Sequence, residues 1–221
     1  MSIFDILSNF REGLLSGLLV TLKLCLIVWA AGLFLGSIIG ILGAKWHLPV
    51  GVPSRAISFI LSGVPVLAFL FWLHYPLQTM LHVVIDPFYT AAAALSIINI
   101  FAVSDVVRGV LRDFPTQYIL AAQASGLSQS QILLNIQAPI ILRQILPSLL
   151  TIQVSMLQAT LFASLISVEE LFRVAQRINA IIYRPVEIYT ALALLFLVIC
   201  LPLNGLALWL KAKFTRDLSE T

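Results

Sequence analysis

Charged residues are scarce in this sequence, and hydrophobic residues are abundant. Only 10% of its 221 residues are charged, whereas 60% are hydrophobic. A soluble globular protein of this size needs more charge than this to cover its surface, so the composition excludes one. We expect an all-α polytopic membrane protein in which residues 1–221 form a single transmembrane domain.

Motifs for nucleotide binding, catalysis, metal binding and nucleic-acid binding are also missing. No GxxxxGK[ST] phosphate-binding loop occurs, since the nearest string, Gly43-Ala44-Lys45, is too short and lies at the end of an apolar run. Catalytic constellations and metal-ligand spacings are lacking as well, and Cys25 and Cys200 lie inside apolar runs without ligating neighbours. The net charge of +3 comes without a basic patch or aromatic platform for nucleic acid. We therefore expect no enzyme, no metal or cofactor in this chain and no nucleic-acid partner.

Long apolar runs make up most of the chain. A helix needs about 20 apolar residues to cross the hydrocarbon core of a bilayer. Five runs qualify as transmembrane spans: residues 14–44, 56–73, 88–107, 149–168 and 187–210. The first is too long for the apolar region of a cleavable signal peptide. An odd number of spans places the two termini on opposite sides of the membrane.

The basic residues indicate the orientation of these spans. Short cytoplasmic loops carry an excess of Lys and Arg. With the N-terminus outside and the C-terminus in the cytoplasm, the inner side holds Lys45, Arg55, Arg108, Arg112, Arg143, Lys211, Lys213 and Arg216. The outer side then holds fewer, namely Arg11, Arg173, Arg177 and Arg184.

A partly polar segment, residues 112–147, interrupts the apolar runs. Residues 117–125 are suited to a short helix, and Gly126 to the left-handed conformation that ends one. A second helix is expected to begin at Ser128, a good N-cap, with Gln131 three residues later as in a capping box. The segment is therefore predicted to form two short helices joined at a sharp bend.

The second predicted helix has one apolar side. Ile132, Leu133 and Ile136 recur at helical spacing with polar residues between them, and Pro139 is expected to limit the helix. An apolar ridge of this kind suits a groove on another protein. Packing of the ridge on the chain's own spans is the alternative, and the spacing alone does not decide between the two.

This segment resembles the EAA loop of ABC importer permeases. The resemblance rests on Ala121, Ala122, Gly126, Ile136 and Pro139 and on the gaps between them. In that family the loop is the cytoplasmic coupling helix that docks into the ATPase subunit. The resemblance implies that coupling to the ATPase is carried by Ala121, Ala122, Gly126, Ser128, Ile132, Ile136 and Pro139.

The segment departs from the family pattern at individual positions. Leu120 stands where the family usually has Glu, and Ala138 where it usually has Leu. Residues 62–65, Ser-Gly-Val-Pro, only approximate the family's Arg-Gly-Thr-Pro. The gap lengths are intact, so the departures concern the individual contacts to the ATPase and the kind of ATPase partner.

Flanking residues are similar to the polar amino acid branch of this family, the histidine, glutamine and arginine permeases. The matches are residues 17–24, Arg108-Gly109, Ala159-Thr160 and residues 164–166. They imply a type I importer permease of a bacterial inner membrane, with five transmembrane helices and a cytoplasmic coupling helix pair. The implied partners are an ABC ATPase that holds ATP and Mg²⁺, an identical or homologous second permease, a periplasmic or surface solute-binding protein and bilayer lipid.

The fourth apolar run is the most polar of the five. Its polar side chains fall on two helical stripes, Thr151, Ser155 and Gln158 on one and Gln153, Thr160, Ser164 and Ser167 on the other. Polar groups inside a bilayer face protein or water, so one stripe is expected to pack and the other to line a pathway. Candidate pathway residues are Gln153, Ser155, Gln158, Thr160 and Ser164. Hydrogen bonds between helices, without a pathway, are the alternative.

A short amphipathic stretch follows this run on the expected outer side. In the proteins that this sequence resembles, the region adjoins the outer gate and faces the binding protein. The resemblance makes Glu169, Glu170 and Arg173 candidates for that gate. A solvated outer helix without such a role is the alternative.

The function that these features predict is that of a permease subunit in an ATP-driven importer. It would move an amino acid or a similar small polar solute by alternating access. Five spans are too few to enclose a pathway, which implies that two permease subunits pair. A membrane scaffold or channel subunit without energy coupling is one alternative. A secondary transporter is another, although its spans would be expected to show internal repeats, and none is convincing here.

Overall fold

The structure is a computed structural model that describes residues 3–219, with side chains described as far as Phe214. Over this range the chain is helical. In chain order the helices are α1 (Ile3–Asn9), α2 (Arg11–Ala31), α3 (Ser37–Lys45), α4 (Val52–Gly63), α5 (Val66–His74), α6 (Pro76–Met80), α7 (Pro87–Arg112), α8 (Thr116–Ala124), α9 (Gln129–Ile132), α10 (Ala138–Ala159), α11 (Leu171–Ile182) and α12 (Pro185–Ser219). Arg216, expected among the inner basic residues, has no described side chain.

Four helical stretches of the described chain are long and apolar enough to cross a membrane. They are Arg11–Lys45, Pro87–Arg112, Gln129–Ile166 and Pro185–Phe214. π-helical turns join α2 to α3 and α9 to α10, so two of the four stretches comprise more than one labelled helix. The expected spans at residues 14–44, 88–107 and 187–210 fall within these stretches.

The expected span at residues 56–73 is broken in the middle. The helical stretches His47–Gly63 and Val66–Met80 meet at an angle of 99°. At the break Val64 is extended, with φ −97° and ψ 124°, and it precedes Pro65. Proline disfavours the helical conformation of the residue before it and lacks an N–H for the helix, so the chain turns here.

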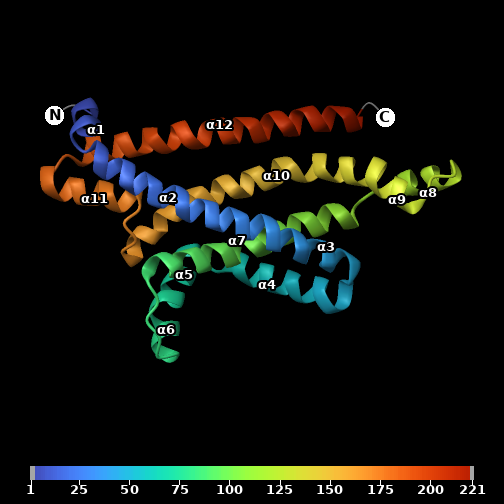
Figure 1. The fold of residues 1–221 in the computed structure, drawn as a ribbon, viewed down its shortest axis with the longest axis horizontal. Helices are drawn as coiled ribbons and strands as arrows, with labels where there is room; N and C mark the ends of the chain where they lie inside the picture. The colour runs from blue at the N-terminus through green and yellow to red at the C-terminus, as the bar shows by residue number, and fades with distance from the viewer. Residues whose placement is uncertain (1–2, 220–221) are drawn as a thin grey trace.

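Helix α7 packs against α2, α3, α4, α5 and α10, and the α2–α3 stretch crosses over it (Figure 1). Gly32, Gly36 and Gly40, which recur at four-residue intervals and form a glycine track, pack against α7. A Cβ atom at Gly36 would lie 2.6 Å from the carbonyl oxygen of Ile100, and one at Gly40 would lie 2.7 Å from Val107 Cβ. Only glycine permits this approach, so the small-residue track packs within the chain.

The two ends of the molecule carry different elements. Helices α8 and α9 lie at one end of the long axis, which is also the end of the C-terminus (Figure 1). Helix α11 and the N-terminus lie at the opposite end. The segment that resembles a coupling loop and the stretch expected at the outer gate are therefore separated by the length of the bundle.

Candidate functional site

The bend between α8 and α9 has the local geometry that its residues predict. Gly126 adopts a left-handed conformation with φ +79°, and the N–H of Leu127 folds back to donate to the carbonyl oxygen of Ala122 at 3.2 Å. Ser128 and Gln131 form a capping box: the Gln131 N–H donates to Ser128 Oγ at 3.4 Å, and the Ser128 N–H donates to Gln131 Oε1 at 2.9 Å. The predicted helix ends at this bend are confirmed.

The expectation that Pro139 limits the second helix is wrong. The chain is helical from Gln129 to Ile166 without a break. A π-helical turn over Leu133–Gln137 precedes the proline, which then stands in the first turn of α10. Such a turn changes the hydrogen-bonding register at the place where proline lacks a donor, so the helix continues past Pro139. The second helix of the pair is therefore the beginning of a membrane-spanning helix.

The residues expected to contact the ATPase divide into two groups. Ala122 and Ile132 are buried within the chain, where their side chains hold the bend together. Ala121, Gly126 and Ser128 are exposed, and Ile136 and Pro139 are partly buried. Large apolar side chains exposed on the two helices of the bend and in the turn that follows include Leu120, Leu127, Leu133 and Leu134. Leu134 was not singled out by the helical spacing, because the π-helical turn shifts which side chains face outward.

The two polar stripes of α10 face different surroundings. Gln153, Thr160 and Ser164 are buried against the other spans. Thr160 and Ser164 donate their hydroxyl hydrogens to carbonyl oxygens of their own helical segment, those of Leu157 at 2.6 Å and Leu161 at 2.7 Å. Three of the five residues expected along the pathway are thus buried within the chain, and their polar groups are satisfied there.

Gln153 and its partner Asn99 join three spans through side-chain and backbone hydrogen bonds. Asn99 Nδ2 donates to Gln153 Oε1 at 2.9 Å and to the carbonyl oxygen of Val28 at 2.9 Å. The indole N–H of Trp29 donates to the carbonyl oxygen of Gln153 at 2.9 Å. These bonds connect α2, α7 and α10 in the interior, where unsatisfied polar groups are costly.

The second stripe of α10 is exposed. Thr151, Ser155 and Gln158 lie on the surface of the chain. Ser148, also exposed, continues the stripe toward the end of the molecule that carries α8 and α9 (Figure 1), here called the coupling end. No part of the chain that the structure describes covers these side chains. Thr151 and Ser155 donate their hydroxyl hydrogens to carbonyl oxygens of their own helix, those of Pro147 at 3.0 Å and Thr151 at 3.1 Å. The remaining hydrogen-bonding capacity of this exposed stripe favours contact with water or a protein partner over lipid, which offers no hydrogen bonds.

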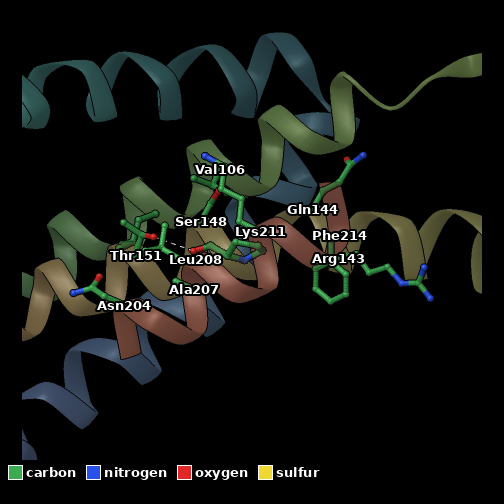
Figure 2. Close-up of a pocket in the computed structure, with 12 residues that line it drawn as sticks. Val106, Arg143, Gln144, Ser148, Thr151, Asn204, Ala207, Leu208, Lys211 and Phe214 are labelled. Carbon is green, nitrogen blue, oxygen red and sulfur yellow. Dashed lines mark hydrogen bonds between the residues drawn. The ribbon is translucent and has the colours of Figure 1, made fainter. Parts of the chain in front are cut away.

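A cavity of about 660 Å³ adjoins the coupling end of this stripe. Figure 2 shows it between α10 and α12, with Ser148 and Thr151 on one helix and Asn204 and Lys211 on the other. Arg143 lies at its coupling end, and Val106, Ile152 and Leu208 are among its apolar lining residues. Ser148 and Asn204 were missed from sequence, although Asn204 is the one amide side chain in the run 187–210.

At the opposite end, the three residues expected at the outer gate do not form one group. Glu170 is fully buried and caps α11, accepting the N–H groups of Phe172 at 3.0 Å and Arg173 at 2.8 Å. Glu169 is exposed and pairs with Arg177 at 3.0 Å and with Arg173 at 4.0 Å. The gate candidates therefore comprise one interior cap and one surface ion-pair network.

The setting of Glu170 follows from close packing of α11 on α2. A Cβ atom at Gly17 would lie 3.0 Å from Leu171 Cα, and Thr21 Oγ1 accepts the Leu171 N–H at 3.1 Å. Burial raises the pKa of the Glu170 carboxyl to about 7, an effect that its backbone hydrogen bonds only partly offset. Gly17 and Thr21, which lie in the matching residues 17–24, thus support the start of α11.

Residues 32–216 match the family of binding-protein-dependent transport system inner membrane components. The chain belongs to this family. Among its relatives, the probable glutamine ABC transporter permease protein GlnP of Bacillus subtilis is 32% identical over 165 residues, which cover 74% of each chain. The arginine ABC transporter permease protein ArtQ of Haemophilus influenzae is 29% identical over 215 residues, covering 95% of this chain and 96% of the relative.

Solved structures show the same fold for this transport component. One, described as an amino acid ABC transporter with histidines, superposes with a TM-score of 0.84 at 22% sequence identity, covering 96% of this chain and 99% of that one. The MetNI methionine ABC transporter, in an inward-facing conformation, gives a TM-score of 0.73 at 17% identity, covering 92% and 97%. The fold is therefore that of a type I ABC importer permease, as expected.

The family decides among the functions left open by sequence. The chain is a permease subunit of an ABC importer, and the alternatives of a scaffold, a channel subunit or a secondary transporter are not favoured. Leu120, which replaces the family's usual Glu, lies on the surface of this permease and is 63% exposed. A leucine can offer a partner only apolar contact at this place.

Proposed function

We propose that this permease imports an amino acid or a similarly small polar solute into a bacterial cell, as part of an inner-membrane complex. Its relatives include proteins named as permeases for glutamine, arginine, octopine and histidine/lysine/arginine/ornithine. The complex would contain an ABC ATPase, which holds ATP and Mg²⁺, a second permease and a binding protein that delivers the solute. The N-terminus would lie outside and the coupling loop and C-terminus in the cytoplasm.

One observation supports this proposal most strongly. The helix that begins in the coupling loop is the helix that carries the exposed polar stripe, continuous over 38 residues from Gln129 to Ile166. A displacement of α9 by the ATPase would therefore be transmitted along the helix to Ser155 and Gln158. Interfaces and packed helices switch between discrete arrangements, which is the basis of alternating access.

The solute pathway would run along the exposed stripe and be closed by the second permease. Ser155 and Gln158 offer hydrogen bonds to a polar solute, and Ser148 and Thr151 continue them to the cavity at the coupling end. The positively charged side chains of Arg143 and Lys211 at this end would attract the carboxylate of an amino acid. Gln153, Thr160 and Ser164 would keep the helix in place without contacting the solute.

The experiment is ATP-dependent uptake of amino acids by the reconstituted complex, with Ser155→Leu compared with Ser62→Leu. Both serines are exposed and bond a carbonyl oxygen of their own helix, at 3.1 Å and 2.8 Å, but Ser62 lies outside the stripe. Loss of a solute contact worth about 1.4 kcal/mol lowers uptake about tenfold in Ser155→Leu. Equal uptake by both variants would remove the stripe from the pathway.

A further inference from the structure

Two adjoining cavities lie at the coupling end of α4 and α7. The first, about 470 Å³, is lined by Arg55, Asp105, Arg108, Gly109, Arg112 and Asp113. The second, about 380 Å³, shares Arg55 and Arg108 with it and adds an apolar wall that includes Val52 and Phe59. A basic cavity and a more apolar one therefore lie side by side, with Arg55 and Arg108 lining both.

Arg108 is held in place between the two cavities. Its side chain is only 8% exposed and pairs with Asp105, which also accepts the hydroxyl hydrogen of Ser58. Its Nη1 donates to the carbonyl oxygen of Gly51 at 3.4 Å. Its Nε–H, in contrast, has no acceptor among the described residues. A buried charged donor without a partner is costly, and an anion beside this guanidinium group would offset part of the cost.

The charges around Arg108 favour an anion. The Arg108–Asp105 pair cancels its own charges, and Arg55 and Arg112 add two exposed guanidinium groups for which the described residues provide no ion pair. Asp113 is the one remaining carboxylate of the lining, so the cavity keeps one net positive charge. Three guanidinium groups around one cavity present the donor geometry that phosphate oxygens accept well.

The apolar side of the site is exposed at the surface of the chain. Phe59 is 79% exposed, and Val52 and Ile60 beside it are also exposed. Figure 1 places α4 at the edge of the bundle, away from α8 and α9. A surface that combines exposed apolar side chains at the edge of a membrane protein with arginines at one end matches a lipid better than a soluble subunit.

We propose that this pair of cavities binds an anionic phospholipid. The phosphate lies among Arg55, Arg108 and Arg112, and one acyl chain lies along Val52 and Phe59. Basic pockets between membrane helices at the cytoplasmic side recognise such headgroups. The lipid would bridge α4 to α7 next to the Ser58–Asp105 contact, and so support the half of the broken span that lies nearest the coupling end.

The experiment measures lipid retention by the purified complex with native mass spectrometry, after exchange into phosphatidylglycerol or phosphatidylcholine. The variant is Arg55→Gln with Arg112→Gln, and the control is Arg177→Gln, an exposed arginine at the opposite end. Each basic residue near a headgroup favours it severalfold, so the double variant loses roughly tenfold or more of its phosphatidylglycerol preference. The control keeps the full preference.

Three results would overturn the proposal. Equal retention of phosphatidylglycerol by the parent and the double variant would remove the arginines from any lipid site. Displacement of phosphatidylglycerol by millimolar inorganic phosphate would identify a site for a free anion. Loss of the ATPase subunit from the double variant, with lipid retention unchanged, would identify a protein contact.

Discussion

Asn99 and Gln153 exchange hydrogen bonds between their amide groups in the interior of the bundle. Asn99 Nδ2 donates to Gln153 Oε1 at 2.9 Å, and Gln153 Nε2 donates to Asn99 Oδ1 at 3.3 Å. Gly32 faces Asn99 so closely that a Cβ atom would overlap its amide. The pair thus fixes how α7 and α10 meet beneath the first span, and the stripe on the other side of α10 is left free for function.

Replacing Gln153 by Leu should lower stability. The change leaves the amide of Asn99 with one partner fewer in a buried site, at a cost of roughly 1–2 kcal/mol. Thermal unfolding of the purified permease in detergent measures this. Gln158→Leu on the exposed stripe is the control, with parent-like melting and reduced uptake. Identical melting of Gln153→Leu and the parent would contradict the role of the pair.

Gly126→Val should uncouple transport without preventing membrane insertion. Valine resists the left-handed conformation at φ +79°, at a cost of about 1–2 kcal/mol, and the bend would lose its angle. The measurement is solute-stimulated ATP hydrolysis by the reconstituted complex. Gly205→Val is the control, because Gly205 lies inside α12 with nothing within 4 Å of an added Cβ atom. Normal stimulation in Gly126→Val would show that the bend is not needed.

Leu120→Glu should weaken docking of the ATPase. A groove that receives leucine has no donor for a carboxylate, and burying one there costs roughly 1–3 kcal/mol, or about a tenfold to hundredfold loss of affinity. Retention of the ATPase during purification measures the effect. Gln123→Glu, an exposed position on the same helix, controls for added charge. If the Leu120→Glu variant retains the ATPase as well as the parent does, the ATPase groove accepts Glu at this position, as it does for the usual EAA loop of the family.

The free energy of unfolding should fall as pH rises from about 4.5 to about 7, because Glu170 is protonated in the folded chain over this range. Burial raises the pKa of this carboxyl to about 7. Between those pH values the folded chain keeps a proton that the unfolded chain has lost, so each step upward favours unfolding until both forms are ionised. Glu170→Gln, compared with Glu169→Gln, should flatten the dependence of melting temperature on pH. A slope that persists unchanged in Glu170→Gln would assign it to other groups.

Local features of the fold were predictable, whereas features set by packing were not. The bend at Gly126 and the cap at Ser128 depend on a few adjacent residues, and both are present. Two prolines with similar sequence signals have opposite outcomes: the chain breaks at Pro65, but a π-helical turn carries the helix through Pro139. What neighbouring spans allow decides between these outcomes, and a sequence does not contain their positions.

The two polar stripes of α10 show the same limit of prediction from sequence at the candidate site. Both are polar and both recur at helical spacing, so the pattern predicts two faces without saying which one packs. The partner at Asn99 lies 54 positions before Gln153 in the chain. The packing of α10 on α7 and α2 buries Gln153, and it leaves Ser155 and Gln158 on the exposed side of the helix.

Thiol labelling along α10 tests the central claim most directly, that the exposed stripe lines a pathway controlled by the ATPase. The native Cys25 and Cys200 are buried and give little background. In the assembled complex, Ser155→Cys and Gln158→Cys should react with a water-soluble maleimide at rates that change when ATP is added, whereas Leu26→Cys on the exposed apolar face of α2 should react slowly under both conditions. Slow labelling at 155 and 158, unaffected by ATP, would contradict the account.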